Sequence, residues 1–140
     1  MADEKRCLFC RIVTGSDSAH EVLRTDTVVA FLDIRPVFHG HTLVVPAAHV
    51  DTLPDLPADR LADYFSALQL ISRAIPQALG SQGTWVSINN VVSQSVPHLH
   101  THVVPRTKGD GLRGFFWPRT SYAENEAKET AERIRSAVKQ

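Results

Sequence analysis

His-Leu-His-Thr-His-Val-Val-Pro-Arg, residues 98–106, places a histidine at every second position. In a β-strand this spacing puts the three side chains on one face, about 7 Å apart, whereas in a helix it would scatter them around the axis. The valines that follow favour extended backbone, and Pro105 is expected to end the strand. The segment therefore predicts a strand that carries a row of three imidazoles.

A row of imidazoles can support several kinds of chemistry, because histidine titrates near neutral pH and can act as nucleophile, proton donor or metal ligand. In one hypothesis the middle histidine, His100, attacks an electrophile and forms a covalent intermediate. In a second, two or three of the histidines hold a catalytic zinc. In a third, they are merely polar residues on a solvent-facing strand.

Motifs elsewhere in the chain distinguish between these hypotheses. In order, they are FLDIRP at 31–36, GHTLVVPAAH at 40–49, SINN at 87–90, and QSVP at 94–97, directly before His98. Together with the histidine row they resemble the histidine triad (HIT) superfamily of nucleotide hydrolases and transferases, over a region from Cys7 to Arg106. The resemblance implies an α+β fold, a five-stranded antiparallel sheet with a long helix, assembled as a homodimer.

The resemblance also implies catalytic roles. His100 would attack the α-phosphate of a purine nucleotide and form a covalent nucleotidyl-histidine, which water then hydrolyses. The backbone carbonyl of His98 would fix the tautomer of His100, His102 would act at the departing oxygen, and His41 would support the row from a neighbouring strand. The substrates expected are dinucleoside polyphosphates or nucleoside phosphoramidates. The non-catalytic alternative is a nucleotide-binding regulatory protein with little turnover.

Nucleotide-binding residues are expected on two segments. Asp33 matches the family's ribose-binding aspartate; the alternative is a turn cap ahead of Pro36. An apolar slot for the base would be framed by Phe31, Leu32 and Ile34. Donors for the phosphate oxygens are Asn89, Gln94, Ser95 and Val96, the last through its backbone; the alternative is ordinary loop polarity.

Cys7 and Cys10 form a Cys-x-x-Cys pair. Taken alone, the pair can be a redox motif, two buried thiols or half of a tetrahedral zinc site. A redox motif normally follows a βαβ pattern, which this chain lacks. The resemblance to zinc-containing bacterial HIT proteins implies that His49 and His98 are the other two ligands of a structural zinc.

The net charge and composition limit the classes of binding partner that we expect. The chain has 140 residues and a formal net charge of zero, and its pI is about 7.1. Neither a nucleic acid nor an anionic membrane is expected as a partner, so the nucleotide should be a small molecule. Long apolar runs are absent from the sequence and residues 1–6 are polar, which favours the cytoplasm.

Periodicity and turn residues predict the order of the elements. The expected elements are a helix at 8–13 ending at Gly15, strands at 20–24, 27–33 and 41–45, a helix from Ala58 that Pro76 ends or kinks, strands at 85–89 and 99–104, and a helix at 123–138. Residues 1–106 form the expected HIT core. Residues 107–140, with an aromatic loop at 109–119, are expected to pack on the same domain.

Overall fold

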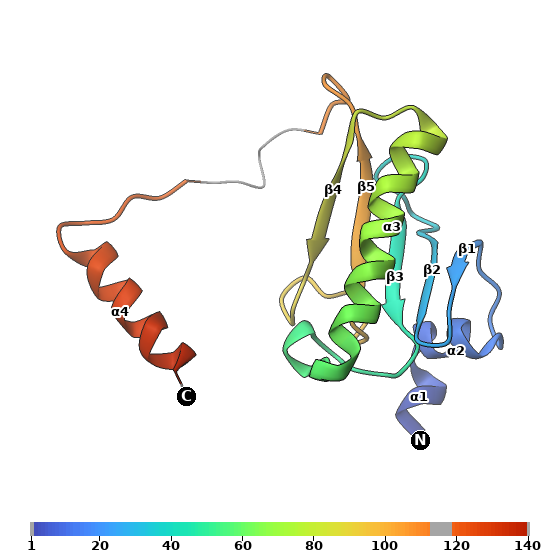
Figure 1. Cartoon of the computed structure of the whole chain (residues 1–140), viewed down its shortest axis with the longest axis horizontal. Helices are drawn as coiled ribbons and strands as arrows, with labels where there is room; N and C mark the ends of the chain where they lie inside the picture. Colours follow the sequence, from blue (N-terminus) through green and yellow to red (C-terminus); the bar gives the residue numbers. More distant parts are fainter. Residues whose placement is uncertain (1, 113–118, 140) are drawn as a thin grey trace. The chain divides into compact units, whose positions relative to one another are not determined.

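Five strands form a single antiparallel sheet in the order β1-β2-β3-β5-β4 (Figure 1). The computed structural model describes residues 2–112 and 119–139. The elements are α1 (Ala2–Arg6), α2 (Leu8–Thr14), β1 (Glu21–Arg24), β2 (Val28–Leu32), β3 (Thr42–Pro46), η1 (Leu53–Asp55), η2 (Ala58–Arg60), α3 (Leu61–Leu79), β4 (Gly83–Ile88), β5 (Thr101–Arg106) and α4 (Glu126–Val138). The predicted α+β class and five-stranded sheet are confirmed.

The histidine-bearing strand β5 lies between β3 and β4. His102 is paired with Leu43 on one side and with Ser87 on the other. The strand begins later than expected, at Thr101, and it continues through Pro105 to Arg106. The prediction that Pro105 ends it was wrong, because the pairing with β3 stops at Val103 and Pro105 has only β4 beside it. A residue without an N–H is tolerated where one side of the strand is unpaired.

The long helix α3 lies across one face of the sheet (Figure 1). Its last residue is Leu79, and Gly80 caps it in the left-handed region with φ 75°. Of the two effects expected of Pro76, ending the helix was wrong, and a kink at Pro76 remains a prediction. Proline removes one N–H and therefore one backbone bond, and the backbone N–H of Gly80 still donates to the Pro76 carbonyl at 2.9 Å.

Alternation along the strands divides the core into two clusters. In β2, Val28 and Ala30 face α3, whereas Val29 and Phe31 pack with α2 on the other face. The cluster under α3 also includes Leu99 and Val103 of the β5 segment. The alternating residues of that segment, including all three histidines, therefore face away from α3. The predicted one-sided row of imidazoles is confirmed.

The chain divides into two compact units, Met1–Asp110 and Gly111–Gln140. Arg106 closes the first unit, because its guanidinium contacts the Asp110 carboxylate at 2.6 and 3.2 Å. Residues 1–106 as the HIT core and the packing of residues 107–140 on the same domain remain predictions. Most of the aromatic loop, residues 113–118, lies outside the described residues. Within the described ranges, no helix is long and apolar enough to cross a membrane.

Candidate functional site

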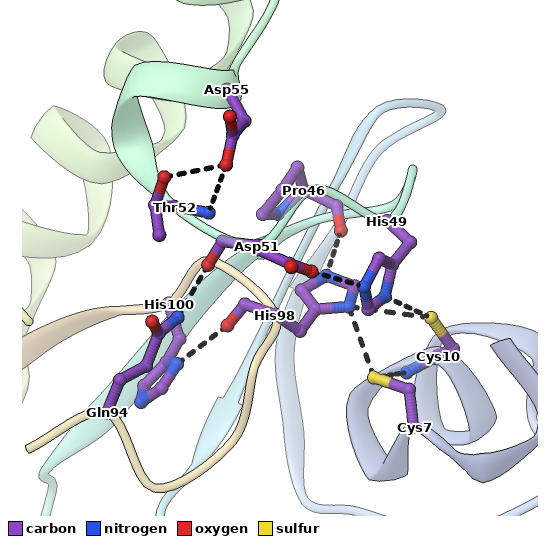
Figure 2. Close-up of polar contacts among 10 residues, drawn as sticks. All are labelled: Cys7, Cys10, Pro46, His49, Asp51, Thr52, Asp55, Gln94, His98 and His100. Atoms are coloured by element: carbon purple, nitrogen blue, oxygen red, sulfur yellow. Dashed lines mark hydrogen bonds and ion pairs between the residues drawn. The ribbon is translucent and has the colours of Figure 1, made fainter. Parts of the chain in front are cut away.

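Two cysteines and two histidines meet where α2 approaches the sheet (Figure 2). Cys7 caps the N-terminus of α2 and accepts a hydrogen bond from the backbone N–H of Cys10 at 3.4 Å. One helical turn separates the two residues, so both thiols point to the same side. His49 follows β3 and His98 precedes β5. The four ligand atoms lie within 4.8 Å of one another, as the zinc prediction requires.

The donor set fits a tetrahedral zinc ion. Cys10 Sγ lies 3.2 Å from His49 Nδ1 and 3.5 Å from His98 Nδ1, and Cys7 Sγ lies 3.4 Å from His98 Nδ1. Ideal zinc–sulfur and zinc–nitrogen bonds give edges of about 3.6 Å between such donors. Burial beside Cys7 raises the pKa of the Cys10 thiol to about 12. A divalent cation would offset this cost of forming two adjacent thiolates.

Both histidines of the cluster present the correct nitrogen. His98 donates its Nε2–H to the Pro46 carbonyl at 2.9 Å, and His49 donates its Nε2–H to the Asp51 carboxylate at 2.8 Å (Figure 2). These bonds leave the Nδ1 lone pair of each ring directed at the thiols. His98 is fully buried, and burial lowers its pKa to about 4, so its ring is neutral at pH 7.

His100 is held in one tautomer. Its Nδ1–H donates to the backbone carbonyl of His98 at 2.8 Å, as expected from the sequence (Figure 2). The Nε2 lone pair is then the nucleophilic position of the ring. The Phe9 ring meets the His100 ring edge to face, with centroids 5.0 Å apart. His98 thus has two roles: its ring belongs to the Cys/His cluster, and its backbone carbonyl accepts the hydrogen bond from His100.

His41 and His102 form a directed hydrogen-bonded pair. The backbone N–H of Val37 donates to His41 Nδ1 at 3.1 Å, so His41 carries its proton on Nε2. This Nε2–H donates to His102 Nδ1 at 2.9 Å, which leaves the proton of His102 on Nε2. Burial, with His100 and His41 nearby, lowers the pKa of His102 to about 4, and burial also lowers the pKa of His41. Both rings are neutral at pH 7.

This pairing gives no support to a catalytic metal held by the histidine row. Asp33, His41 and His102 do lie close enough to be considered as ligands. However, the two facing nitrogens of His41 and His102 share one proton at 2.9 Å, so they have no lone pair free for a common ion. The His98 ring is directed at the thiols, on the other side of His100.

Asp33 lies beside this pair, directly after β2. Its Oδ1 accepts the backbone N–H of Arg35 at 2.9 Å, the contact expected for a turn cap, and its Oδ2 lies 3.7 Å from His41 Nε2. Ribose binding by Asp33 remains a prediction. Of the residues expected to frame the base, Phe31 is buried, Leu32 is half-buried and Ile34 is 82% exposed.

The loop expected to bind phosphate has a constrained backbone. Val91 and Ser93 adopt left-handed φ angles of 70° and 61°, which are unfavourable for a β-branched valine. Asn89 donates to the Ser93 carbonyl at 3.2 Å, and Gln94 accepts the Val91 N–H at 2.9 Å. These two side chains therefore shape the loop itself.

A hollow of about 470 Å³ lies between this loop and the start of α2. Its lining residues are Arg6, Cys7, Leu8, His49, Asp51, Ser95, Val96 and Pro97. The volume falls within the range of small-molecule sites. Ser95 and Val96, two positions expected to bind phosphate, therefore line the same hollow as Cys7 and His49 of the Cys/His cluster.

Sequence reasoning assigned no role to several residues that support the site. Tyr64 of α3 donates its hydroxyl hydrogen to the Val44 carbonyl at 2.8 Å, and its oxygen lies 2.7 Å from Thr101 Oγ1. Thr101 lies between His100 and His102 and is fully buried. A threonine between Leu99 and Val103, the apolar residues that alternate with the histidines, was a signal for a buried polar partner. Phe9 and Asp51 gave no comparable signal.

The HIT domain family matches residues 15–109 of the chain. "Protein hit" of Bacillus subtilis is 35% identical over 137 residues, which cover 96% of this chain and 92% of the relative. The adenosine 5'-monophosphoramidase hnt1 of Schizosaccharomyces pombe is 32% identical over 135 residues, covering 95% and 98%. The asymmetrical bis(5'-nucleosyl)-tetraphosphatase of the same organism is 32% identical over 108 residues, covering 76% and 58%.

Solved structures agree with the fold. A HIT family member from Bacillus subtilis superposes with a TM-score of 0.84 at 33% identity, covering 93% of this chain and 95% of that one. A zinc-bound histidine triad family protein from Mycobacterium smegmatis has a TM-score of 0.73 at 34% identity, covering 96% and 99%.

Proposed function

The chain belongs to the HIT domain family, and we propose that it is a nucleotide hydrolase in which His100 forms a covalent intermediate with the α-phosphate of a purine nucleotide. The observation that carries the proposal is the bond from His100 Nδ1 to the His98 carbonyl. It leaves Nε2 of a neutral ring free to attack phosphorus. Relatives named as a phosphoramidase and a nucleosyl-tetraphosphatase support the substrate class.

The first step forms a bond between His100 Nε2 and the α-phosphorus while the bond to the leaving group breaks. The ring then carries a positive charge, and its Nδ1–H stays on the His98 carbonyl. When the leaving group departs through oxygen, neutral His102 donates its Nε2–H as a hydrogen bond to that oxygen and stabilises the charge there. The nitrogen of a phosphoramidate instead takes a proton from solvent as its bond to phosphorus breaks, and it leaves as the neutral amine. Val37 and His41 keep His102 in the tautomer that this role needs.

In the second step water attacks phosphorus and the phosphorus–nitrogen bond breaks. The Nε2 lone pair returns to His100, and the proton of the water passes to solvent or to the released amine. One water molecule is consumed per bond cleaved. Asp33 would accept the ribose hydroxyls, and Ser95 with the backbone of Val96 would donate to the phosphate oxygens.

Zinc is proposed as a structural ion held by Cys7, Cys10, His49 and His98. When bound, it would join α2 to the segment that follows β3 and to the segment that precedes β5. Its closed set of four ligands offers no position for substrate. Two free cysteines as metal ligands are in keeping with the reducing cytoplasm. A homodimer is also part of the proposal, since β4 stands at an edge of the sheet.

Substitution of the nucleophile tests the mechanism. His100→Ala should lower hydrolysis of adenosine phosphoramidate and diadenosine tetraphosphate by more than about 10³-fold, while AMP binding measured by calorimetry stays largely intact. The control His20→Ala, which removes an exposed histidine, should leave both unchanged. A His100→Ala rate near that of the wild type would refute covalent catalysis. If the wild type binds AMP but hydrolyses neither substrate, the protein is a nucleotide-binding regulatory protein and the proposed hydrolase activity is refuted.

A further inference from the structure

Asp51 contacts both halves of the site (Figure 2). Its carboxylate accepts the Nε2–H of His49, a member of the metal cluster, at 2.8 Å. Its backbone carbonyl accepts the side-chain amide of Gln94, in the loop expected to bind phosphate, at 2.5 Å. One residue therefore joins the Cys/His cluster to this loop.

On the cluster side, the carboxylate orients a ligand. With Nε2–H held by Asp51, the His49 ring directs Nδ1 toward Cys10 Sγ, 3.2 Å away. A carboxylate on the far nitrogen also makes an imidazole a better electron donor. The Asp51 side chain is 62% exposed, so little besides His49 fixes its position. An ion that immobilises His49 would immobilise Asp51 as well.

On the loop side, hydrogen bonds rather than apolar packing hold residues 89–95 in place. Val91 and Val92 are each 77% exposed, and Val91 is held in an unfavourable left-handed conformation. Gln94 binds the Val91 N–H with one end of its amide and the Asp51 carbonyl with the other. The backbone N–H of Leu53 adds a bond to Asn90 Oδ1 at 2.9 Å. Residues 51–53 therefore hold the loop in its shape.

We propose that Asp51 is a positioning residue that couples zinc binding at the Cys7–Cys10–His49–His98 cluster to the shape of the loop at residues 89–95, and so to nucleotide binding. The nucleotide part rests on the proposed function. The same cluster reaches His100 through the His98 carbonyl. Filling the cluster would thus order both the phosphate donors and the nucleophile.

The metal half is tested with zinc alone. Zinc affinity is measured by competition with a chromophoric chelator for the full chain. Asp51→Asn should weaken binding about 10-fold and Asp51→Ala up to about 100-fold. The matched control is Asp55→Asn. Among the contacts drawn in Figure 2, the Asp55 carboxylate accepts hydrogen bonds only from Thr52, from its backbone N–H and from its hydroxyl. Asp51→Ala within about twofold of the wild type would overturn the proposal.

The loop half is tested at saturating zinc, where wild type and variants are compared by circular dichroism to establish that they are folded. The side-chain amide signals of Gln94, assigned by their loss in Gln94→Met, should move in the NMR spectrum of Asp51→Ala but not of Asp55→Asn. The AMP dissociation constant should rise roughly 5- to 10-fold in Asp51→Ala. Unmoved Gln94 signals, or an unchanged AMP affinity, would overturn the coupling.

These readouts separate the two proposals. If the wild type binds no nucleotide, the proposed function fails, whereas the zinc affinities and the Gln94 signals still report on Asp51. If AMP binds and is not affected by Asp51→Ala, the coupling fails and the proposed function stands.

Discussion

Tyr64→Phe should destabilise the protein by about 2–4 kcal/mol, although it removes a single oxygen atom. The Tyr64 side chain is 1% exposed. Its hydroxyl contacts the Val44 carbonyl at 2.8 Å and Thr101 Oγ1 at 2.7 Å. A buried polar group that loses its partner costs about 1–3 kcal/mol, and the substitution leaves two such groups behind. The phenylalanine ring keeps the packing under α3.

A double-mutant cycle isolates the contact with Thr101. Thr101→Val should cost about 1 kcal/mol in the wild type, because Tyr64 keeps its bond to Val44. In the Tyr64→Phe background the same change should be neutral or stabilising, because it removes the unpaired hydroxyl. The expected coupling is therefore about 1–2 kcal/mol, measured by urea unfolding followed by circular dichroism.

The control for the cycle is Tyr122→Phe, since Tyr122 is 66% exposed. It should change stability by less than about 0.5 kcal/mol. If the effects of Tyr64→Phe and Thr101→Val add to within about 0.5 kcal/mol, the two hydroxyls do not interact and the reasoning is refuted.

Two further predictions concern the site. The folded-state pKa of His102, about 4, lies below its ordinary value of 6.5, so its stabilising contribution is present above pH 6.5 and is lost as the pH falls toward 4. Urea unfolding at pH 7, 6 and 5 should show that His102→Gln loses less free energy of unfolding with falling pH than the wild type does. The difference should be at most about 1.4 kcal/mol per pH unit, and less because the ring is partly exposed. Parallel pH profiles of the two proteins would contradict this. If Asp33 binds ribose, Asp33→Ala should weaken AMP by about 1.5–3 kcal/mol in calorimetry and hardly affect a 2',3'-dideoxy analogue. Equal losses for both nucleotides would leave Asp33 only its turn-cap role.

Much of the site could be predicted from local patterns. Alternation from His98 to His102 is enough to put three imidazoles on one face, because side chains in extended backbone alternate strictly. The Cys7–Cys10 spacing is likewise a local property of a helical turn. The partners His49 and His98 came from the resemblance to zinc-containing HIT proteins, and the distances of 3.2–3.5 Å agree with it.

Other features were beyond sequence reasoning for physical reasons. The tautomers of His41 and His102 depend on the backbone N–H of Val37, and every residue except proline has such a group. The link from Asp51 to Gln94 also uses a backbone carbonyl, across 43 positions of sequence. The pattern around Pro76 left open whether the helix ends or kinks there, because tertiary packing, which the local sequence does not contain, helps to decide whether a helix continues past a proline.

The place of β5 in the sheet has a consequence for synthesis on the ribosome. It is the last strand of the described chain to be made, yet it lies between β3 and β4. Synthesis proceeds at about 5–20 residues per second, so β1, β2, β3 and β4 are all made before β5, which is the sheet neighbour of both β3 and β4. Cys7 and Cys10 are made early, whereas His98 follows 91 positions after Cys7 and 88 positions after Cys10. Until β5 is made, the two thiols lack His98 as a partner and are exposed to oxidation or to adventitious metal ions. The nascent chain is therefore most susceptible to both just before this last strand is synthesised.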